Sequence, residues 1–140
     1  MHSSFCVALA CLLTIGTQTT ADAAGGQKTK LLPLKRDYTA YTLQRVSVRT
    51  GCFPARLKVI LAHIARQTGR KPMITSGLRP HAGKSQHTRC FAADFRIPGI
   101  SERKILAAAA SAPGIGGIGR YCNGIVHVDV GPRRSWAHCR

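Results

Sequence analysis

Three residues in the second half of the chain carry side chains that together could hold a metal ion. His87 and Asp94 are separated by six residues, and His127 follows much later. Two imidazoles and one carboxylate form the ligand set of many catalytic zinc ions, which keep a fourth position open for water. The residue types therefore predict a zinc ion, Zn2+, bound by these three side chains.

Alternating side chains predict that Asp94 and His127 lie on strands. Residues 91–97 alternate in the period of a half-buried strand, with Asp94 on the face opposite the two phenylalanines. An Asn-Gly dipeptide predicts a tight hairpin turn into a second strand over 125–130. In that strand three valines share one face and His127 shares the other. We expect His87 to come from the polar loop before the first of these strands.

Two helices and one more strand are predicted around these elements. Apolar residues recur at helical spacing over 54–68, and Gly69 ends the helix. A short strand is predicted over 71–76. Ser101 is expected to cap a second helix that runs to about Ser111.

The order of these elements predicts an α+β fold. It runs helix, strand, strand, helix, strand, strand, with at least one hairpin, which favours a small, mainly antiparallel sheet with flanking helices. We expect the helices to cover one face of the sheet. The zinc site is then expected on the open face.

Composition limits the class of protein. The chain has 140 residues, 44% of them hydrophobic, which suits one small soluble domain. No run of about 18 apolar residues is present, so no transmembrane segment is predicted in the mature chain. Lys and Arg number 21 against 5 acids, a formal charge of +16 that favours polyanionic partners. Because no basic motif is interleaved with aromatic residues, we predict no specific nucleic acid partner, and we expect a monomer.

The first residues have the pattern of an export signal. An apolar stretch over 5–16 precedes small residues at positions 21 and 23, which predicts a signal peptide over 1–23. An extended N-terminal arm over 24–46 and a functional domain over 47–140 are expected to follow. The alternative is an uncleaved N-terminal helix buried in the fold.

Four cysteines remain after the predicted signal peptide. An even number in an exported chain predicts two disulfides among Cys52, Cys90, Cys122 and Cys139. Three pairings are possible, and the sequence does not choose among them. Our working prediction joins Cys52 to Cys90 and Cys122 to Cys139.

Two other interpretations of the metal-binding residues stay open. Cys90 and Cys122 with His87 and His127 would form a closed structural zinc site, although thiols of an exported chain tend to be oxidised. Alternatively, His87 lies in a solvated loop, Asp94 pairs with a nearby arginine, and His127 is a satisfied residue on the face of its strand.

Four segments narrow these choices. Ser-Gly-Leu-Arg at 76–79, the run from Ser85 to Asp94, Gly-Gly-Ile-Gly-Arg-Tyr at 116–121 and the run from Val126 to Trp136 occur in this order. Together they resemble the zinc D-alanyl-D-alanine carboxypeptidase and murein endopeptidase group (LAS-type zinc peptidases). The resemblance covers roughly residues 51–139.

The resemblance implies a function. It implies that His87, Asp94 and His127 hold zinc, and that Arg79 binds a substrate carboxylate through its guanidinium fork. The zinc peptidase-like domain would hydrolyse peptide bonds in peptidoglycan stems or cross-links, as a D,D-carboxypeptidase or a murein endopeptidase. Such a bacterial protein would act in the periplasm or after secretion.

The chain departs from the group in two places. The loop between Arg79 and His87 is shorter than in many members, and Ile125 stands where many carry a catalytic His or Glu. Asp129 is the leading substitute, either as general base or transition-state support, or as a partner that orients His127. Because isoleucine cannot take a proton, the alternative function is a catalytically inactive zinc-containing envelope protein that binds peptidoglycan. A nucleic-acid-binding role based on charge is the weakest alternative.

Overall fold

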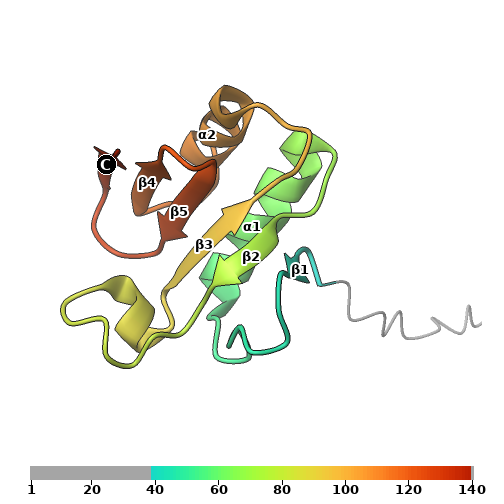
Figure 1. Ribbon diagram of the computed structural model, residues 1–140. Helices are drawn as coiled ribbons and strands as arrows, with labels where there is room; N and C mark the ends of the chain where they lie inside the picture. The colour runs from blue at the N-terminus through green and yellow to red at the C-terminus, as the bar shows by residue number, and fades with distance from the viewer. Residues whose placement is uncertain (1–38, 140) are drawn as a thin grey trace, which may run out of the picture. The chain divides into compact units, whose positions relative to one another are not determined.

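The computed structural model describes residues 39–139. The predicted signal peptide and most of the predicted arm lie outside them. Six strands form one sheet in the order β1-β2-β3-β5-β4-β6. Strands β1 to β5 are labelled in Figure 1. Their bounds are β1 Thr42–Leu43, β2 Met73–Ser76, β3 Ala92–Arg96, β4 Gly117–Tyr121, β5 Ile125–Asp129 and β6 Arg134–His138.

The sheet is mixed, with an antiparallel centre. The pairs β2–β3, β3–β5 and β5–β4 are antiparallel, whereas β1–β2 and β4–β6 are parallel. The predicted α+β class is confirmed, but the two outer strands were not predicted. Both pair with strands that are remote in sequence, so no local hairpin signal marks them. Residues 42–43 of the predicted arm form β1, which bonds to β2.

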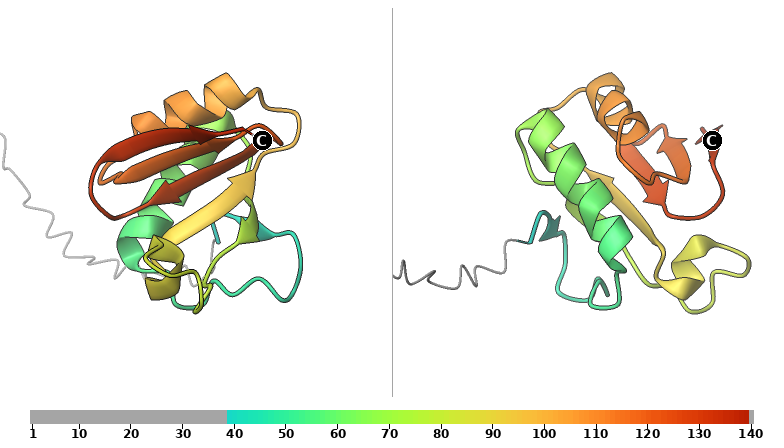
Figure 2. Two further views of the ribbon diagram at one scale, coloured as in Figure 1. Left: turned by 60° about the vertical axis from the view of Figure 1, so that its left-hand side comes forward. Right: turned by 180° about the vertical axis from the view of Figure 1, so that it is seen from behind.

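The two helices match their predicted positions. Helix α1 spans Ala55–Thr68 and ends at Gly69, whose φ of 74° lies in the left-handed region that favours glycine. Helix α2 spans Glu102–Ala110, and the Ser101 hydroxyl accepts a hydrogen bond from the Lys104 N–H. Both helices lie on the same side of the sheet (Figure 2).

The hydrophobic core fills the space between the helices and the sheet. Its fully buried members include Leu57, Ile60, Leu61 and Ile64 of α1, Ala109 of α2, and Ile74, Phe95, Val126 and Val128 of the strands. Because side chains alternate along a strand, the neighbours of these strand residues point to the opposite face. Asp94 and His127 therefore lie on the face that the helices leave open, as predicted.

Two disulfides join the cysteines in the pairing that we had predicted, Cys52 with Cys90 and Cys122 with Cys139. The first bond ties the segment before α1 to Cys90, two residues before β3. The closed structural zinc site that used Cys90 and Cys122 is therefore wrong, because neither sulfur is a free thiolate.

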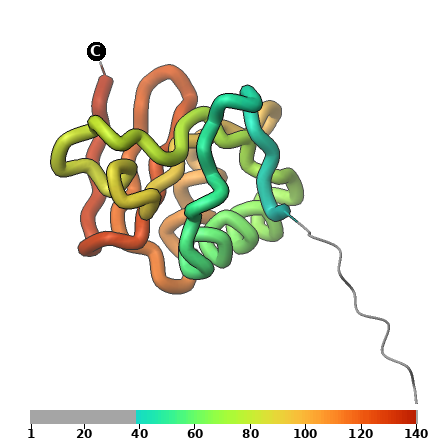
Figure 3. The backbone as a smooth tube through the Cα atoms, turned by 90° about the horizontal axis from the view of Figure 1, so that it is seen from below, coloured from blue at the N-terminus to red at the C-terminus, as the bar shows by residue number. Residues whose placement is uncertain are grey.

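The segment before β3 lies beside the turn that follows β5 (Figure 3). The Val130 N–H donates to the Phe91 carbonyl oxygen at 3.1 Å. A Cβ atom on Gly131 would meet Gln86 Nε2, so the two segments are in close contact. Between residues 39 and 139, no helix has the length and apolar character needed to cross a bilayer.

Replacing Leu61 with Ala should lower the free energy of unfolding by about 2–5 kcal/mol, because it leaves a cavity in the core. The matched control is Val59→Ala on the same helix, where the side chain is 49% exposed. The Val59→Ala change should alter the free energy of unfolding by no more than about 0.5 kcal/mol. Denaturant unfolding followed by circular dichroism measures both. Equal losses would contradict the described core.

Candidate metal centre

His87 lies on a short 3-10 helix, η1, over Gln86–Arg89, rather than in the solvated loop that was one prediction. The Ser85 hydroxyl accepts a hydrogen bond from the His87 N–H at 3.3 Å and so caps this turn. The imidazole is fully buried. Its Nδ1 lies 2.6 Å from the carbonyl oxygen of Gly77 and must donate to it. The lone pair on Nε2 is therefore free to bind a cation.

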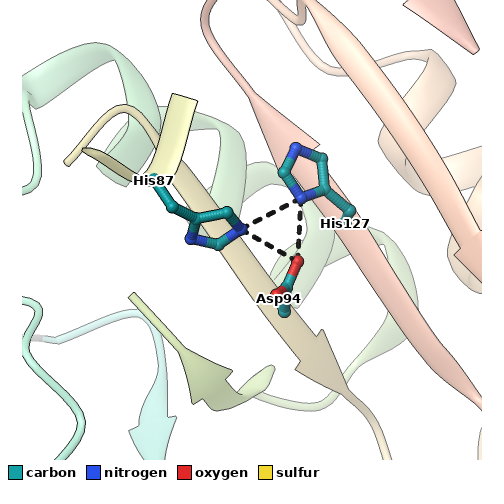
Figure 4. A group of neighbouring side chains, drawn as sticks. All are labelled: His87, Asp94 and His127. Atoms are coloured by element: carbon teal, nitrogen blue, oxygen red, sulfur yellow. Dashed lines mark hydrogen bonds and ion pairs between the residues drawn. The ribbon is translucent and has the colours of Figure 1, made fainter. Parts of the chain in front are cut away.

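Asp94 and His127 are brought together by the antiparallel pairing of β3 and β5. They are directly opposite each other in the strand register. His127 Nδ1 is 2.8 Å from Asp94 Oδ1, and His87 Nε2 is 3.2 Å from each of these atoms. The three side chains point toward one another from η1, β3 and β5 (Figure 4). All three are buried.

The spacing of these three atoms fits one bound metal ion. Donor atoms with bonds of about 2.0–2.1 Å in a tetrahedral site lie about 3.3 Å from one another. The observed separations of 2.8–3.2 Å are close to that value. Two imidazole nitrogens and one carboxylate oxygen also suit a divalent transition metal. The group could therefore bind a metal through one atom of each residue.

Asp129 holds the second imidazole. Asp129 Oδ2 is 3.0 Å from His127 Nε2, which donates to it and leaves the Nδ1 lone pair directed at the metal position. The carboxylate is fully buried, and it accepts from the N–H groups of Gly117 and Gly131 at 2.9 and 2.8 Å. Arg134 donates to it at 2.7 Å. Both oxygens of Asp129 are thus occupied by donors.

Two glycines of β4 leave space for these side chains. A Cβ atom on Gly117 would collide with the Asp129 carboxylate, and one on Gly119 would collide with the indole of Trp136. That indole lies with its ring centroid 5.0 Å from the imidazole of His127. The Gly-x-Gly spacing of this strand is therefore required by the packing around the metal centre.

The electrostatics hold the two carboxylates ionised. Burial raises the pKa of Asp94, but the imidazoles of His127 and His87, when protonated, donate to its carboxylate and leave the pKa below its ordinary value. Burial likewise raises the pKa of Asp129, and the donors His127, Gly117 and Gly131 bring it down to about 2. Burial lowers the pKa of His127, yet its two carboxylate partners raise it overall.

Arg79 stands at the edge of this group. Its guanidinium lies 3.7 Å from Asp94 Oδ2, and its side chain remains 48% exposed. It borders a surface pocket of about 340 Å³ that is also lined by Pro80, His81 and Ala82. Arg79 is therefore close enough to the metal position to act on a molecule bound there, and exposed enough to meet it.

Two further titratable residues, Glu102 and His138, have partners outside this group. Glu102 pairs with Arg120 at 3.5 Å, and His138 packs edge-on against Tyr121. Two contributors to the group were not predicted from the sequence, the Gly77 carbonyl and Arg134. A backbone carbonyl has no sequence signature, and nothing local distinguishes Arg134 from the other arginines.

Comparisons with known proteins agree with this geometry. A family model described as peptidoglycan L,D-endopeptidase MepK matches residues 34–136, a span that includes every residue of the metal centre. It confirms the resemblance to the murein endopeptidase group. No solved structure matches the chain.

Two curated relatives carry this description. The peptidoglycan L,D-endopeptidase MepK of Escherichia coli strain K12 is 46% identical over 56 residues, which cover 39% of this chain and 30% of that protein. The probable peptidoglycan L,D-endopeptidase MepK of Haemophilus influenzae is 33% identical over 92 residues, which cover 65% of this chain and 48% of that protein. The chain thus spans less than half the length of these relatives.

Replacing Asp94 with Asn should weaken metal binding by more than 10- to 100-fold, which is the typical loss when a residue that hydrogen-bonds to a metal ligand is replaced. The reason is that a neutral amide replaces the one anionic donor atom. The control is Glu102→Gln, which removes a carboxylate engaged with Arg120 instead. Competition with a chromogenic chelator measures both affinities. Unchanged binding by the Asp94 variant would exclude the described centre.

Proposed function

The chain belongs to the peptidoglycan L,D-endopeptidase MepK family, and from this membership we propose that it is a zinc-dependent peptidase. The proposed reaction is hydrolysis of a peptide bond between an L and a D centre in peptidoglycan cross-links. This is narrower than the sequence prediction, which left carboxypeptidase and endopeptidase action open. The observation that carries the proposal is the convergence of His87, Asp94 and His127 on one point.

We propose that the ion is Zn2+, held by His87 Nε2, Asp94 Oδ1 and His127 Nδ1. Three protein ligands with two nitrogens and one oxygen are typical of catalytic zinc sites. When bound, zinc supplies a Lewis acid that polarises a carbonyl group and lowers the pKa of water. The residues around it keep both imidazoles in the tautomer that presents a lone pair.

Arg79 is proposed to hold a carboxylate of the substrate. An exposed guanidinium can form two parallel hydrogen bonds to a carboxylate, which fixes both position and orientation. Peptidoglycan peptides are rich in carboxylates, and the chain carries 21 Lys and Arg against 5 acids. The positive charge therefore favours approach of this substrate.

Asp129 is proposed to position His127 rather than to serve as the general base. Its two oxygens accept hydrogen bonds from His127, two backbone N–H groups and Arg134, and its side chain is fully buried. A carboxylate so occupied has no free oxygen with which to take a proton from water.

A catalytically inactive zinc-binding protein of the cell envelope is the second candidate. Ile125 favours it, since this apolar residue stands where many members of the group carry a proton-transferring side chain. For either candidate we propose export to the periplasm or beyond, as the signal peptide pattern over 1–23 and the two disulfides favour. The candidates differ in hydrolysis, not in metal binding.

Hydrolysis should depend on the metal and its ligands. Cross-linked muropeptides incubated with the protein should yield new termini by mass spectrometry, and a chelator should abolish the products. His87→Ala should reduce turnover to background because it removes one ligand. The matched control is His63→Ala, whose ring meets Ser111 between the helices and should be neutral. Zinc binding without any product would favour the inactive candidate.

Arg79→Ala should raise KM for a carboxylate-bearing muropeptide about 10-fold or more, because a hydrogen bond to a charged group is worth about 1.5–3 kcal/mol. The KM of the Arg79→Lys variant should lie between those of the parent and the alanine variant, because lysine keeps the charge but cannot form the two parallel hydrogen bonds of a guanidinium. Steady-state kinetics measure this, with Arg103→Ala on α2 as a surface control. If the Arg79 and Arg103 variants shift KM equally, charge alone explains the effect.

A further inference from the structure

The C-terminal strand carries an arginine that contacts Asp129, the carboxylate that hydrogen-bonds to His127 of the metal centre. Parallel pairing with β4 sets Arg134 of β6 opposite Gly117. From there its guanidinium Nη2 lies 2.7 Å from Asp129 Oδ2, and Nη1 lies 3.4 Å from Oδ1. Each guanidinium nitrogen thus faces a different carboxylate oxygen. The Pro132 carbonyl oxygen also accepts from Nη1, at 3.0 Å.

The burial of Asp129 makes this contact important. Its side chain has no exposed surface, and an ionised carboxylate out of water is costly unless it is paired and hydrogen-bonded. Arg134 is the arginine that forms an ion pair with it among residues 39–139. The same Oδ2 atom accepts from His127 Nε2 at 3.0 Å. The position of this oxygen thus affects the orientation of a metal ligand.

Arg134 is itself held in place. Its guanidinium carbon lies 5.0 Å from the centroid of the Trp136 ring, a distance at which a cation is attracted to an aromatic face. The same ring packs against the imidazole of His127, with the two ring centroids also 5.0 Å apart. Arg134 and Trp136, two residues apart on β6, therefore support His127 by two routes, one through Asp129 and one through ring packing.

We propose that Arg134 is a positioning residue of the metal centre. It fixes the rotamer of Asp129, which in turn fixes the ring and the tautomer of His127 with Nδ1 directed at the metal. The proposal deepens the proposed function, on which it rests for the identity of the metal, but it concerns metal affinity and not the bond that is cleaved. The proposal therefore predicts an effect of Arg134 on binding of the metal ion and none on direct contact with the peptide substrate.

The variants Arg134→Ala and Arg134→Lys, with Arg133→Ala as control, test this proposal. Arg133 is the neighbouring residue, carries the same charge and is exposed. Zinc and cobalt affinities are measured by chelator competition without any peptide. We expect the Arg134→Ala variant to bind the metal ion about 10-fold more weakly. This is the lower end of the loss that is typical when a residue supporting a metal ligand is replaced. Arg134→Lys should recover part of the loss, and Arg133→Ala should stay within about twofold of the parent.

A double-mutant cycle separates positioning from a general loss of stability. If Arg134 acts through Asp129, the combination with Asp129→Asn should cost little more than Asp129→Asn alone. Additive losses, equal affinities for the Arg134 and Arg133 variants, or a parental affinity for Arg134→Ala would each overturn the proposal. Arg134→Lys provides the same comparison if the alanine variant does not fold. Failure of muropeptide hydrolysis in the parent would refute the peptidase proposal and leave this measurement unaffected.

Discussion

The register between β3 and β5 is the constraint on which the site depends. It places Asp94 directly opposite His127, with Asp94 Oδ1 and His127 Nδ1 2.8 Å apart. A slip of one residue would turn one of these side chains toward the helices, because strand side chains alternate between faces. The register is held by the apolar side chains of the same strands, Phe95 and Val126 among them, which are fully buried beneath the helices. Core packing on one face thus sets the geometry of the polar group on the other.

The two imidazoles are oriented by partners of different kinds. His87 donates to the backbone oxygen of Gly77, whereas His127 donates to the carboxylate of Asp129. Each partner fixes which nitrogen carries the proton and so which nitrogen can bind a metal. One imidazole is therefore held by the residue after β2 and the other by the C-terminal strands, so the candidate metal centre depends on segments from most of the domain.

The charge distribution follows the same arrangement. The chain is strongly basic, yet Asp94 and Asp129 are both buried at the metal centre. Arg79 and Arg134 each pair with one of them while keeping 48% and 41% of their side chains exposed. The negative charges that suit a cation lie inside, and the positive charges that suit an anionic peptide lie at the surface.

Local patterns were sufficient to predict the helices and the central strands. The helical spacing before Gly69 and the alternation around Asp94 each report how a few neighbouring residues meet a core, and this information is contained in adjacent positions. The residue types and the resemblance were likewise sufficient to predict that His87, Asp94 and His127 belong together.

The sequence by itself determined which donor atoms the protein has and which faces of its strands carry them. Only the tertiary structure decided how these atoms are held. The parallel pairing of β6 with β4 and the contact of His87 with the Gly77 carbonyl join positions that are distant along the chain, or involve backbone atoms that every residue shares. Such contacts arise when the whole sheet closes on its core, so no short segment encodes them.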